Sequence, residues 1–179
     1  MDMTEKKISS KLIYDGKIQR LHVDTVELPN GRQALREVAD HPGGVAVVAL
    51  DRGGNVLTVK QYRYVFSRVI EEFPAGKLEP GENPRDAALR ELREETGATP
   101  ERFTDLGSII VSPGAYGEVL HLYLAEGLDF GSQSPDEDEF LDVVLTPFDT
   151  MVQRVLSGEL TDAKTVVGIL KVYAMRIGK

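Results

Sequence analysis

The most constraining feature of the sequence is an unbroken apolar run from Val45 to Leu50, bounded by His41-Pro42-Gly43-Gly44 and by the turn residues 51–55. A strand with one solvated face alternates between apolar and polar residues, whereas a strand covered on both faces reads as a continuous apolar run. The run therefore predicts a central strand with other structure packed against each of its faces.

The segments around this run predict strands interspersed with a few helices. That order indicates an α/β or α+β sandwich in which helices pack on a mixed sheet. Period-2 patterns and turn residues predict further strands at residues 56–64, 69–73, 107–111, 119–125 and 140–145. Helical patterns predict helices at 84–96, 149–156 and 162–176.

The first forty residues show a different pattern, with strand-like alternation that is clearest in residues 21–28. Pro29-Asn30-Gly31 supplies a turn, after which residues 33–39 can return as a partner strand. We therefore expect a small antiparallel β element in residues 1–42, followed by the main domain in residues 43–179.

Composition excludes several classes of protein. The 179 residues carry a formal net charge of −8, which argues against a protein that follows a nucleic-acid backbone. No stretch approaches the roughly 18 to 20 apolar residues of a membrane span, and the polar start MDMTEKKISS does not read as a signal peptide. The absence of cysteine excludes disulfides and thiolate metal sites, so a cytoplasmic setting is the simplest expectation.

The predicted helix at residues 84–96 has clear boundaries. Asn83 is a favourable N-cap, Pro84 fits the first helical position, and Gly97 is well placed as the C-terminal stop. On a helical wheel, Ala88 and Leu92 lie in the apolar stripe, and the charged residues occupy the rest of the surface.

Three glutamates share one sector of that helix. Glu91 and Glu95 are one turn apart and Glu94 is three residues from Glu91, so their carboxylates are expected to converge. Like charges repel at this spacing, and the helix C-terminus further disfavours them, so the cluster needs a cation. Hard divalent ions such as Mg²⁺ or Mn²⁺ suit carboxylate oxygens. The glutamates alone leave a solvated acidic face open as an alternative, with Arg90 and Arg93 on the solvated side as ordinary partners.

The spacing of residues from Gly76 to Ala98 decides between a metal site and a solvated acidic face. The sequence fits G-x5-E-x7-R-E-U-x-E-E-x-G-U, where U is a bulky apolar residue, with Gly76, Glu82, Arg90, Glu91, Leu92, Glu94, Glu95 and Gly97. This pattern resembles the Nudix box and departs from it only at Ala98, a packing position. The resemblance implies an α/β/α sandwich in which a loop and a helix present metal ligands.

The residue types of the box have physical roles. Gly76 permits a tight backbone path into the site, and Glu82 can pair with Arg90 across the loop. Glu91 and Glu95 are the first-choice metal ligands, and Glu94 is a further ligand or supporting group. Metal ions there would bridge pyrophosphate oxygens and lower the pKa of a bound water.

Segments outside the box resemble the ADP-ribose pyrophosphatase branch of the family. They are Arg36-Glu37, His41-Pro42-Gly43, Gln61-Tyr62-Arg63, Glu72-Phe73-Pro74-Ala75-Gly76, Ser112-Pro113-Gly114 with Glu118 and His121, and Asp136-Glu137-Asp138-Glu139. The resemblance implies hydrolysis of ADP-ribose to AMP and ribose 5-phosphate. It also implies a homodimer in which the N-terminal strands help to build the partner's site, with or without a swap of these strands between subunits.

The same resemblance assigns roles position by position. The carbonyl of Ala75 and the carboxylate of Glu139 would be metal ligands, and Glu137 would be the general base. Arg36 and Arg63 would bind phosphate, for which a guanidinium is suited. Further substrate-binding positions are Glu72, Gly114 and Glu118. Without the resemblance, residues 136–139 read as a solvated acidic turn and Arg63 as a surface arginine.

Other functions stay open at this point. Another nucleoside diphosphate sugar, such as GDP-mannose, or a dinucleotide polyphosphate would need the same box. A Nudix-like domain that senses a nucleotide without cleaving it is a second alternative, although Glu91, Glu94 and Glu95 are all present. An isoprenoid diphosphate isomerase is set aside because that activity relies on a cysteine.

Overall fold

The computed structural model describes residues 1–178, which form two compact units. The N-terminal unit contains Met1–Gly43 together with Ile110–Val119, and the large unit contains Gly44–Ile109 together with the chain from Leu120 onward. Among the helices of this part of the chain, none combines the length and apolar composition that crossing a bilayer requires.

The N-terminal unit is built on a three-stranded antiparallel sheet in the order β1 (Lys6–Asp15), β2 (Arg20–Glu27), β3 (Gln33–Asp40). The predicted strands at 21–28 and 33–39 are confirmed as β2 and β3, and Gly31 adopts a φ of 79° in the turn between them. β1 was not predicted as a separate strand. All of its residues are exposed, so it shows no apolar alternation that burial would impose.

A histidine joins the three strands of this sheet. On β2, Nδ1 of His22 lies 2.9 Å from Oδ1 of Asp24, and Nε2 lies 3.2 Å from Oδ1 of Asp40 on β3. Ser10 on β1 is within 3.3 Å of the same Nδ1 atom, and Lys7 on β1 pairs with Asp24 at 3.5 Å. The hydrogen bond with Asp24, followed by the one with Asp40, raises the pKa of His22.

The segment 110–119 packs along the end of β3. The amide of Ala39 donates to the carbonyl of Ala115 at 2.8 Å, and the amide of Gly117 donates back to the carbonyl of Ala39 at 2.9 Å. The rings of His41 and Tyr116 lie 5.1 Å apart between centroids. These contacts give the segment a fixed place on the N-terminal sheet.

The large unit contains a seven-stranded mixed sheet with the main strand order β10-β5-β4-β9-β8. The strands are β4 (Gly44–Leu50), β5 (Asn55–Arg63), β6 (Arg68–Glu72), β7 (Ala75–Lys77), β8 (Ala98–Ile110), β9 (Val119–Phe130) and β10 (Leu141–Pro147), with a 3-10 turn η1 (Tyr64–Phe66). β4 is parallel to β9 and antiparallel to β5, while β6 pairs with β5 and β7 pairs with β4. Every residue of β4 is buried, which confirms the predicted central strand.

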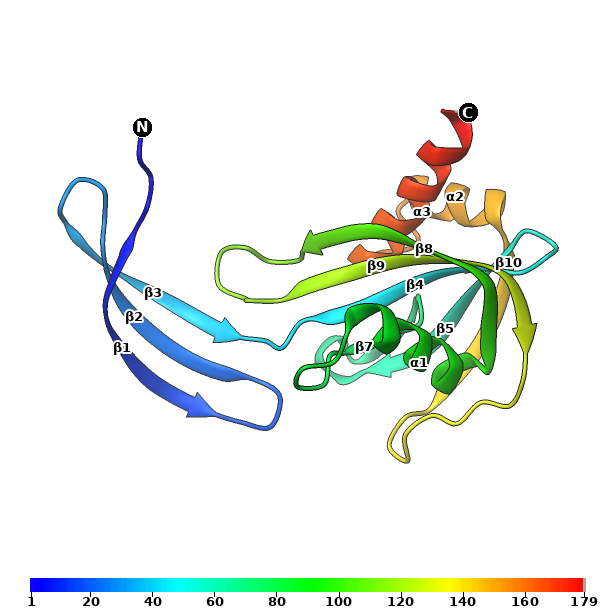
Figure 1. Ribbon diagram of the computed structural model, residues 1–179, viewed down its shortest axis with the longest axis horizontal. Helices are drawn as coiled ribbons and strands as arrows, with labels where there is room; N and C mark the ends of the chain where they lie inside the picture. Colours follow the sequence, from blue (N-terminus) through cyan, green and yellow to red (C-terminus); the bar gives the residue numbers. More distant parts are fainter. Residues whose placement is uncertain (179) are drawn as a thin grey trace. The chain divides into compact units, whose positions relative to one another are not determined.

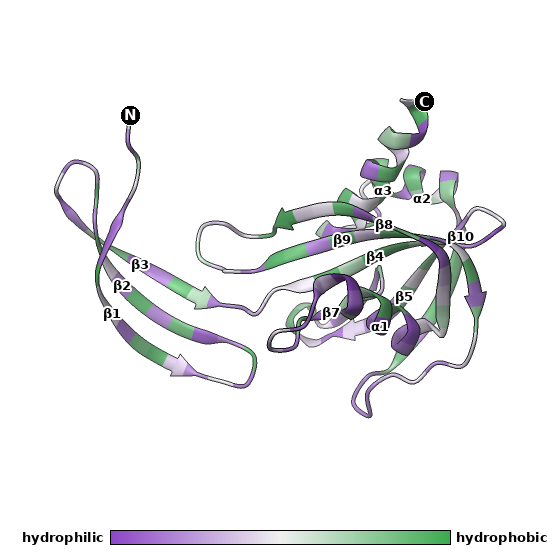
Figure 2. Cartoon of the chain, in the orientation of Figure 1, coloured by the Kyte–Doolittle hydropathy of each residue, from purple (hydrophilic) through white to green (hydrophobic). Residues whose placement is uncertain are grey.

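Helices cover both faces of this sheet, so the predicted α/β/α sandwich is confirmed. α1 (Pro84–Thr96) packs on one face, and α2 (Phe148–Leu156) and α3 (Ala163–Ile177) pack on the other (Figure 1). Side chains of β4 alternate between the two cores: Val45, Val47 and Ala49 join the α1 core, and Ala46, Val48 and Leu50 join the α2–α3 core. Figure 2 shows hydrophilic residues along much of α1, in agreement with one apolar stripe and a charged remainder.

Two strands of the large unit were predicted poorly. The strand expected at residues 107–111 is longer than predicted, since β8 begins at Ala98, directly after α1. Its first part was missed because most of β8 is exposed and carries little apolar alternation. β7, only three residues long, was expected to be part of the loop that follows β6. β7 matters for the site because it pairs with β4 on one side and contacts α1 on the other.

Candidate functional site

Helix α1 carries the acidic cluster, and its boundaries confirm the sequence prediction. Oδ1 of Asn83 accepts a hydrogen bond from the amide of Arg85 at 2.9 Å, and Pro84 is the first helical residue. Gly97 ends the helix with a φ of 71°, and its amide donates to the carbonyl of Arg93. Because the stripe with Ala88 and Leu92 is buried in the sheet core, the glutamates of the next sector face β7.

Arg90 lies at the centre of an ion-pair network that joins the loop before α1 to the helix. Its Nε and Nη2 atoms donate to the two carboxylate oxygens of Glu82 at 2.9 and 3.0 Å, as the box spacing predicted. Its Nη1 atom donates to Glu91 at 2.9 Å and to Glu94 at 3.0 Å. The expectation that Arg90 lies on the solvated side was therefore wrong: its side chain is 27% exposed and neutralises three carboxylates.

Glu95 is the most deeply buried acid of the helix, at 3% exposure. Burial raises its pKa to about 8, and the neighbouring carboxylates of Glu91 and Glu139 push in the same direction. The amide of Ala75 donates to Oε2 of Glu95 at 3.1 Å and opposes that shift. Burial also raises the pKa of Glu91, in spite of the adjacent Arg90 guanidinium.

Gly76 on β7 is in contact with the acidic face of α1. A Cβ atom placed on Gly76 would lie 1.9 Å from Oε1 of Glu91 and 2.0 Å from its Cδ. The glycine is therefore needed for this position of the Glu91 carboxylate and not for its own backbone conformation, because its φ is not in the left-handed region. Its lack of a side chain lets the Glu91 carboxylate lie directly against the β7 backbone.

The three glutamates of α1 do not converge on one point, contrary to the sequence expectation. Glu91 and Glu94 are directed to Nη1 of Arg90, whereas Glu95 is directed to the backbone of Ala75. Accordingly, no three acidic or histidine side chains within residues 1–178 stand close enough to hold a metal ion. The donor set nevertheless suits a hard divalent cation, since the buried Glu95 and the partly buried Glu91, both with raised pKa values, gain most from added positive charge.

The acidic loop between β9 and β10, residues 131–140, is hydrogen-bonded to the C-terminal end of α1. The amides of Gly131 and Ser134 donate to the carbonyls of Gly97 and Glu94 at 2.8 and 2.9 Å. The side-chain amide of Gln133 donates to the carbonyl of Glu95 at 2.6 Å. The helix that carries Glu91 and Glu95 thus also positions the start of the loop.

Glu137 and Glu139 differ in their surroundings on this loop. Glu139 is partly buried, lines a hollow of about 350 Å³ and acts electrostatically on both Glu91 and Glu95. Glu137 is exposed, and no residue among 1–178 forms a hydrogen bond or ion pair with its side chain. The structure therefore brings Glu139 to the cluster and leaves Glu137 facing solvent.

Glu72, at the end of β6, lies between two cations. Its Oε1 atom accepts from Nε of Arg63 at 2.6 Å, and its Oε2 atom accepts from Nζ of Lys164 in the first turn of α3. Glu72 is only 3% exposed. This geometry favours a role in holding Arg63 over the direct substrate contact that the resemblance implied. Lys164 was missed by the sequence reading, because no local motif links it to a residue so distant in the chain.

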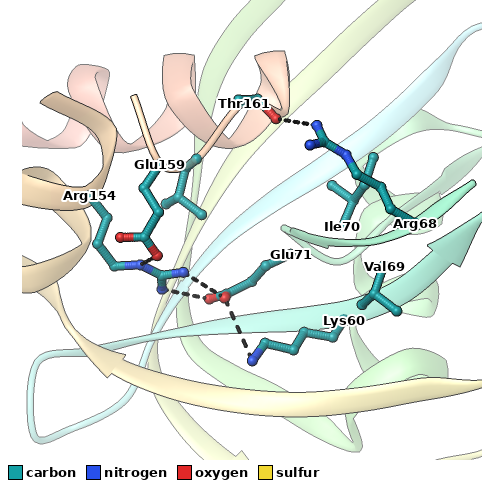
Figure 3. Close-up of a pocket in the computed structure, with 9 residues that line it drawn as sticks. Lys60, Arg68, Val69, Ile70, Glu71, Arg154, Glu159 and Thr161 are labelled. Atoms are coloured by element: carbon teal, nitrogen blue, oxygen red, sulfur yellow. Dashed lines mark hydrogen bonds and ion pairs between the residues drawn. The ribbon is translucent and has the colours of Figure 1, made fainter. Parts of the chain in front are cut away.

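The neighbouring residue Glu71 belongs to a separate polar hollow of about 320 Å³ (Figure 3). Arg154 of α2 donates to both oxygens of Glu71 at 3.0 and 2.9 Å, and to Glu159 at 2.7 Å. Nη2 of Arg68 donates to Oγ1 of Thr161 at 3.2 Å. These bonds attach β6 to α2 and to the connection between α2 and α3.

Three predicted substrate-binding residues lie in the N-terminal unit. Arg36 on β3 is partly buried and pairs with Glu5, with 2.9 Å between Nε and Oε2. Oε1 of Glu118 lies 3.8 Å from Nδ1 of His41. A Cβ atom on Gly114 would meet no neighbour within 4 Å.

Comparison with known proteins matches family models to two successive parts of the chain. A model of the NUDIX domain matches residues 40–166, and a model of the nucleoside diphosphate sugar hydrolase N-terminal domain matches residues 5–39. The chain belongs to the Nudix hydrolase family. Members of this family generally use divalent cations.

The relatives of this Nudix hydrolase match it over nearly their whole length. It is 44% identical to an ADP-ribose pyrophosphatase of Bacillus subtilis, across 93% of this chain and 91% of that protein. It is also 44% identical to a methanol dehydrogenase activator of Bacillus methanolicus, across 92% and 90% of the two chains. The crystal structure of an ADP compounds hydrolase has the same fold, with a TM-score of 0.87, 20% identity and coverage of 99% and 97%.

Proposed function

We propose that this protein hydrolyses the pyrophosphate of ADP-ribose and releases AMP and ribose 5-phosphate. The observation that carries the proposal is a pair of carboxyls, buried Glu95 and partly buried Glu91, held against Ala75 and Gly76 inside a Nudix box that departs from its pattern only at Ala98. The likeness to the B. subtilis ADP-ribose pyrophosphatase supports ADP-ribose as the substrate.

Mg²⁺ is the proposed cofactor, with Mn²⁺ or another divalent ion as a substitute. Glu91, Glu95, the carbonyl of Ala75 and Glu139 would hold it, with Glu94 as a further ligand. When bound, it would polarise the phosphoryl oxygens and lower the pKa of the attacking water. Its charge would also compensate Glu91 and Glu95, whose pKa values are raised by burial.

The protein's own residues bind the substrate and move the proton. Arg63 uses the part of its guanidinium that does not face Glu72 to bind a phosphate of the substrate. Glu137 accepts the proton of the attacking water on a carboxylate oxygen, which its exposed place leaves free to reach substrate. Glu139, which already lies beside the cluster, is the alternative base.

The N-terminal unit contributes to the site through a homodimer in this proposal. Arg36, Gly114 and Glu118 would contact substrate, and the three-stranded sheet would form the subunit contact. Exposed apolar side chains on β1 support a contact surface there, because Ile8, Leu12 and Ile13 are about half exposed at 50%, 46% and 51%. Light scattering tests the dimer, and a monomeric mass for the active enzyme would refute it. A cysteine-free chain is consistent with a cytoplasmic enzyme.

A panel of nucleotides tests the proposed substrate. We expect kcat/KM for ADP-ribose with Mg²⁺ to exceed that for GDP-mannose and for dinucleotide polyphosphates by at least about tenfold. Activity should disappear with EDTA and in Glu91→Gln. A higher kcat/KM for another nucleoside diphosphate compound would move the assignment within the hydrolases. Tight binding of ADP-ribose without turnover of any compound would instead indicate a nucleotide sensor.

A further inference from the structure

Glu72 is a buried carboxylate with a separate cation on each oxygen. Arg63 faces Oε1 from the end of β5, and Lys164 faces Oε2 from α3. Lys164 is itself largely buried, with 13% of its side chain exposed, whereas Arg63 is 41% exposed. Charges this deeply buried are stable only when they are paired in good geometry. Arg63 is the more exposed of the two cations, and it is the one that can reach a ligand.

The first turn of α3 fixes the Lys164 side of this arrangement. Asp162 caps the helix by accepting from the amide of Thr165 at 3.0 Å, and it also accepts from Nζ of Lys164 at 3.0 Å. The hydroxyl of Thr165 donates to Asp162 at 2.6 Å and accepts from the amide of Phe73 at 2.9 Å. One helix start thus holds both the side chain of Glu72 and the backbone of the residue after it.

The Arg63 side of this arrangement orients the guanidinium through one of its nitrogens only. Its Nε atom donates to Glu72, and its two terminal nitrogens form no hydrogen bond with any residue within 1–178. A guanidinium fixed at Nε loses rotational freedom while its terminal N–H groups stay available as donors. The acidic residues Glu95 and Asp162 act on Arg63 electrostatically, which places it beside the α1 cluster.

We propose that Lys164 is a positioning residue that orients Arg63 toward the phosphate through Glu72. The proposal rests on the proposed function, in which Arg63 binds a phosphate of ADP-ribose. Without Lys164, the buried Oε2 atom loses its cation, and the carboxylate is expected to turn toward Arg63 and draw the guanidinium inward. Arg63 then binds phosphate less well, although Lys164 never touches the substrate.

The adjacent Glu71–Arg154 pair provides a matched control. It is also a largely buried ion pair that joins β6 to a helix on the same face of the sheet, with side-chain exposures of 8% and 22%. Figure 3 shows this pair, and none of its hydrogen bonds involves Arg63. Loss of Arg154 therefore weakens the attachment of β6 without affecting the orientation of Arg63.

The experiment measures kinetics with ADP-ribose and Mg²⁺ for Lys164→Met, Lys164→Arg, Arg63→Met, Arg154→Met and the double variant Lys164→Met/Arg63→Met. We expect Lys164→Met to raise KM about tenfold with a smaller change in kcat, and Lys164→Arg to restore most of the loss. In the Arg63→Met background, Lys164→Met should have little further effect. Arg154→Met should lower the unfolding temperature and leave KM within about twofold.

A second measurement does not depend on turnover. The Nε–H signal of Arg63, assigned by its loss in Arg63→Met, should be visible at one chemical shift by nitrogen-15 NMR in the wild type and in Arg154→Met. In Lys164→Met, where the guanidinium is drawn toward Glu72, it should move to a different chemical shift. An unchanged signal in Lys164→Met would overturn the proposal, as would full additivity with Arg63→Met or an equal KM effect in Arg154→Met. If the wild type does not cleave ADP-ribose, the proposed function fails, and the NMR signal still decides whether Lys164 orients Arg63.

Discussion

Replacing Gly76 by alanine tests the close contact between β7 and the acidic face of α1. The new Cβ would lie 1.9 Å from Oε1 of Glu91, and an ordinary contact begins at 3.4 Å. The carboxylate must therefore retreat by about 1.5 Å, the difference between these two distances. The backbone itself tolerates alanine, because Gly76 does not have a positive φ.

The two consequences of this change differ in size. A displacement of about 1 Å in a catalytic group can cost about 100-fold in rate, so we expect kcat to fall by about that factor. Stability should change by less than about 1 kcal/mol, because the displaced group is the end of a flexible side chain. The unfolding temperature should then move by less than about 4 °C.

The assay compares Gly76→Ala with Gly53→Ala in both kcat and unfolding temperature. Gly53 lies in the turn between β4 and β5, lacks a positive φ, and would place its Cβ 3.2 Å from the side chains of Asp51 and Asn55. This control should keep kcat within about twofold. Wild-type kcat in Gly76→Ala would refute the reasoning, and so would an activity loss explained by unfolding of the variant.

Three further outcomes are expected. Glu95→Gln should lower kcat by at least about 100-fold without lowering the unfolding temperature, since a buried carboxyl that resists ionisation contributes little to stability; a normal kcat would exclude Glu95 as a ligand. Glu137→Gln should also reduce kcat at least about 100-fold with folding unchanged, and near-wild-type kcat would transfer the role of base to Glu139 or a box glutamate. His22 has a pKa raised above 6.5 by hydrogen bonds with Asp24 and Asp40, so its stabilising effect is complete below that pH and is lost as pH rises through the raised value. Unfolding curves of His22→Gln and wild type should therefore converge with rising pH, and a gap independent of pH would contradict this.

The parts of the structure that the sequence predicted best depend on local patterns. The run from Val45 to Leu50, the cap at Asn83 and the stop at Gly97 all act within a few residues, and each was found where expected. The Glu82–Arg90 pair was predicted from the spacing of the box and is present. Local rules suffice wherever the interacting groups are close in the chain.

The parts that were missed depend on tertiary contacts. A helical wheel gives the direction of Arg90 from the axis, but it cannot show that Glu82 and Glu94 draw the side chain back across the acidic face. Lys164 meets Glu72 from 92 residues away, and only the packing of α3 on the sheet brings the two together. The strands β1 and β8 are exposed over most of their length, so their sequences do not show the alternation of apolar and polar residues that a half-buried strand has.

Phosphorus NMR of ADP-ribose with the protein and Mg²⁺ tests the central claim most directly. The account predicts that the two pyrophosphate signals are replaced by the monophosphate signals of AMP and ribose 5-phosphate, and that Glu91→Gln and Glu95→Gln leave the substrate signals intact. Pyrophosphate signals that persist with wild-type protein, or equal conversion by both variants, would contradict it.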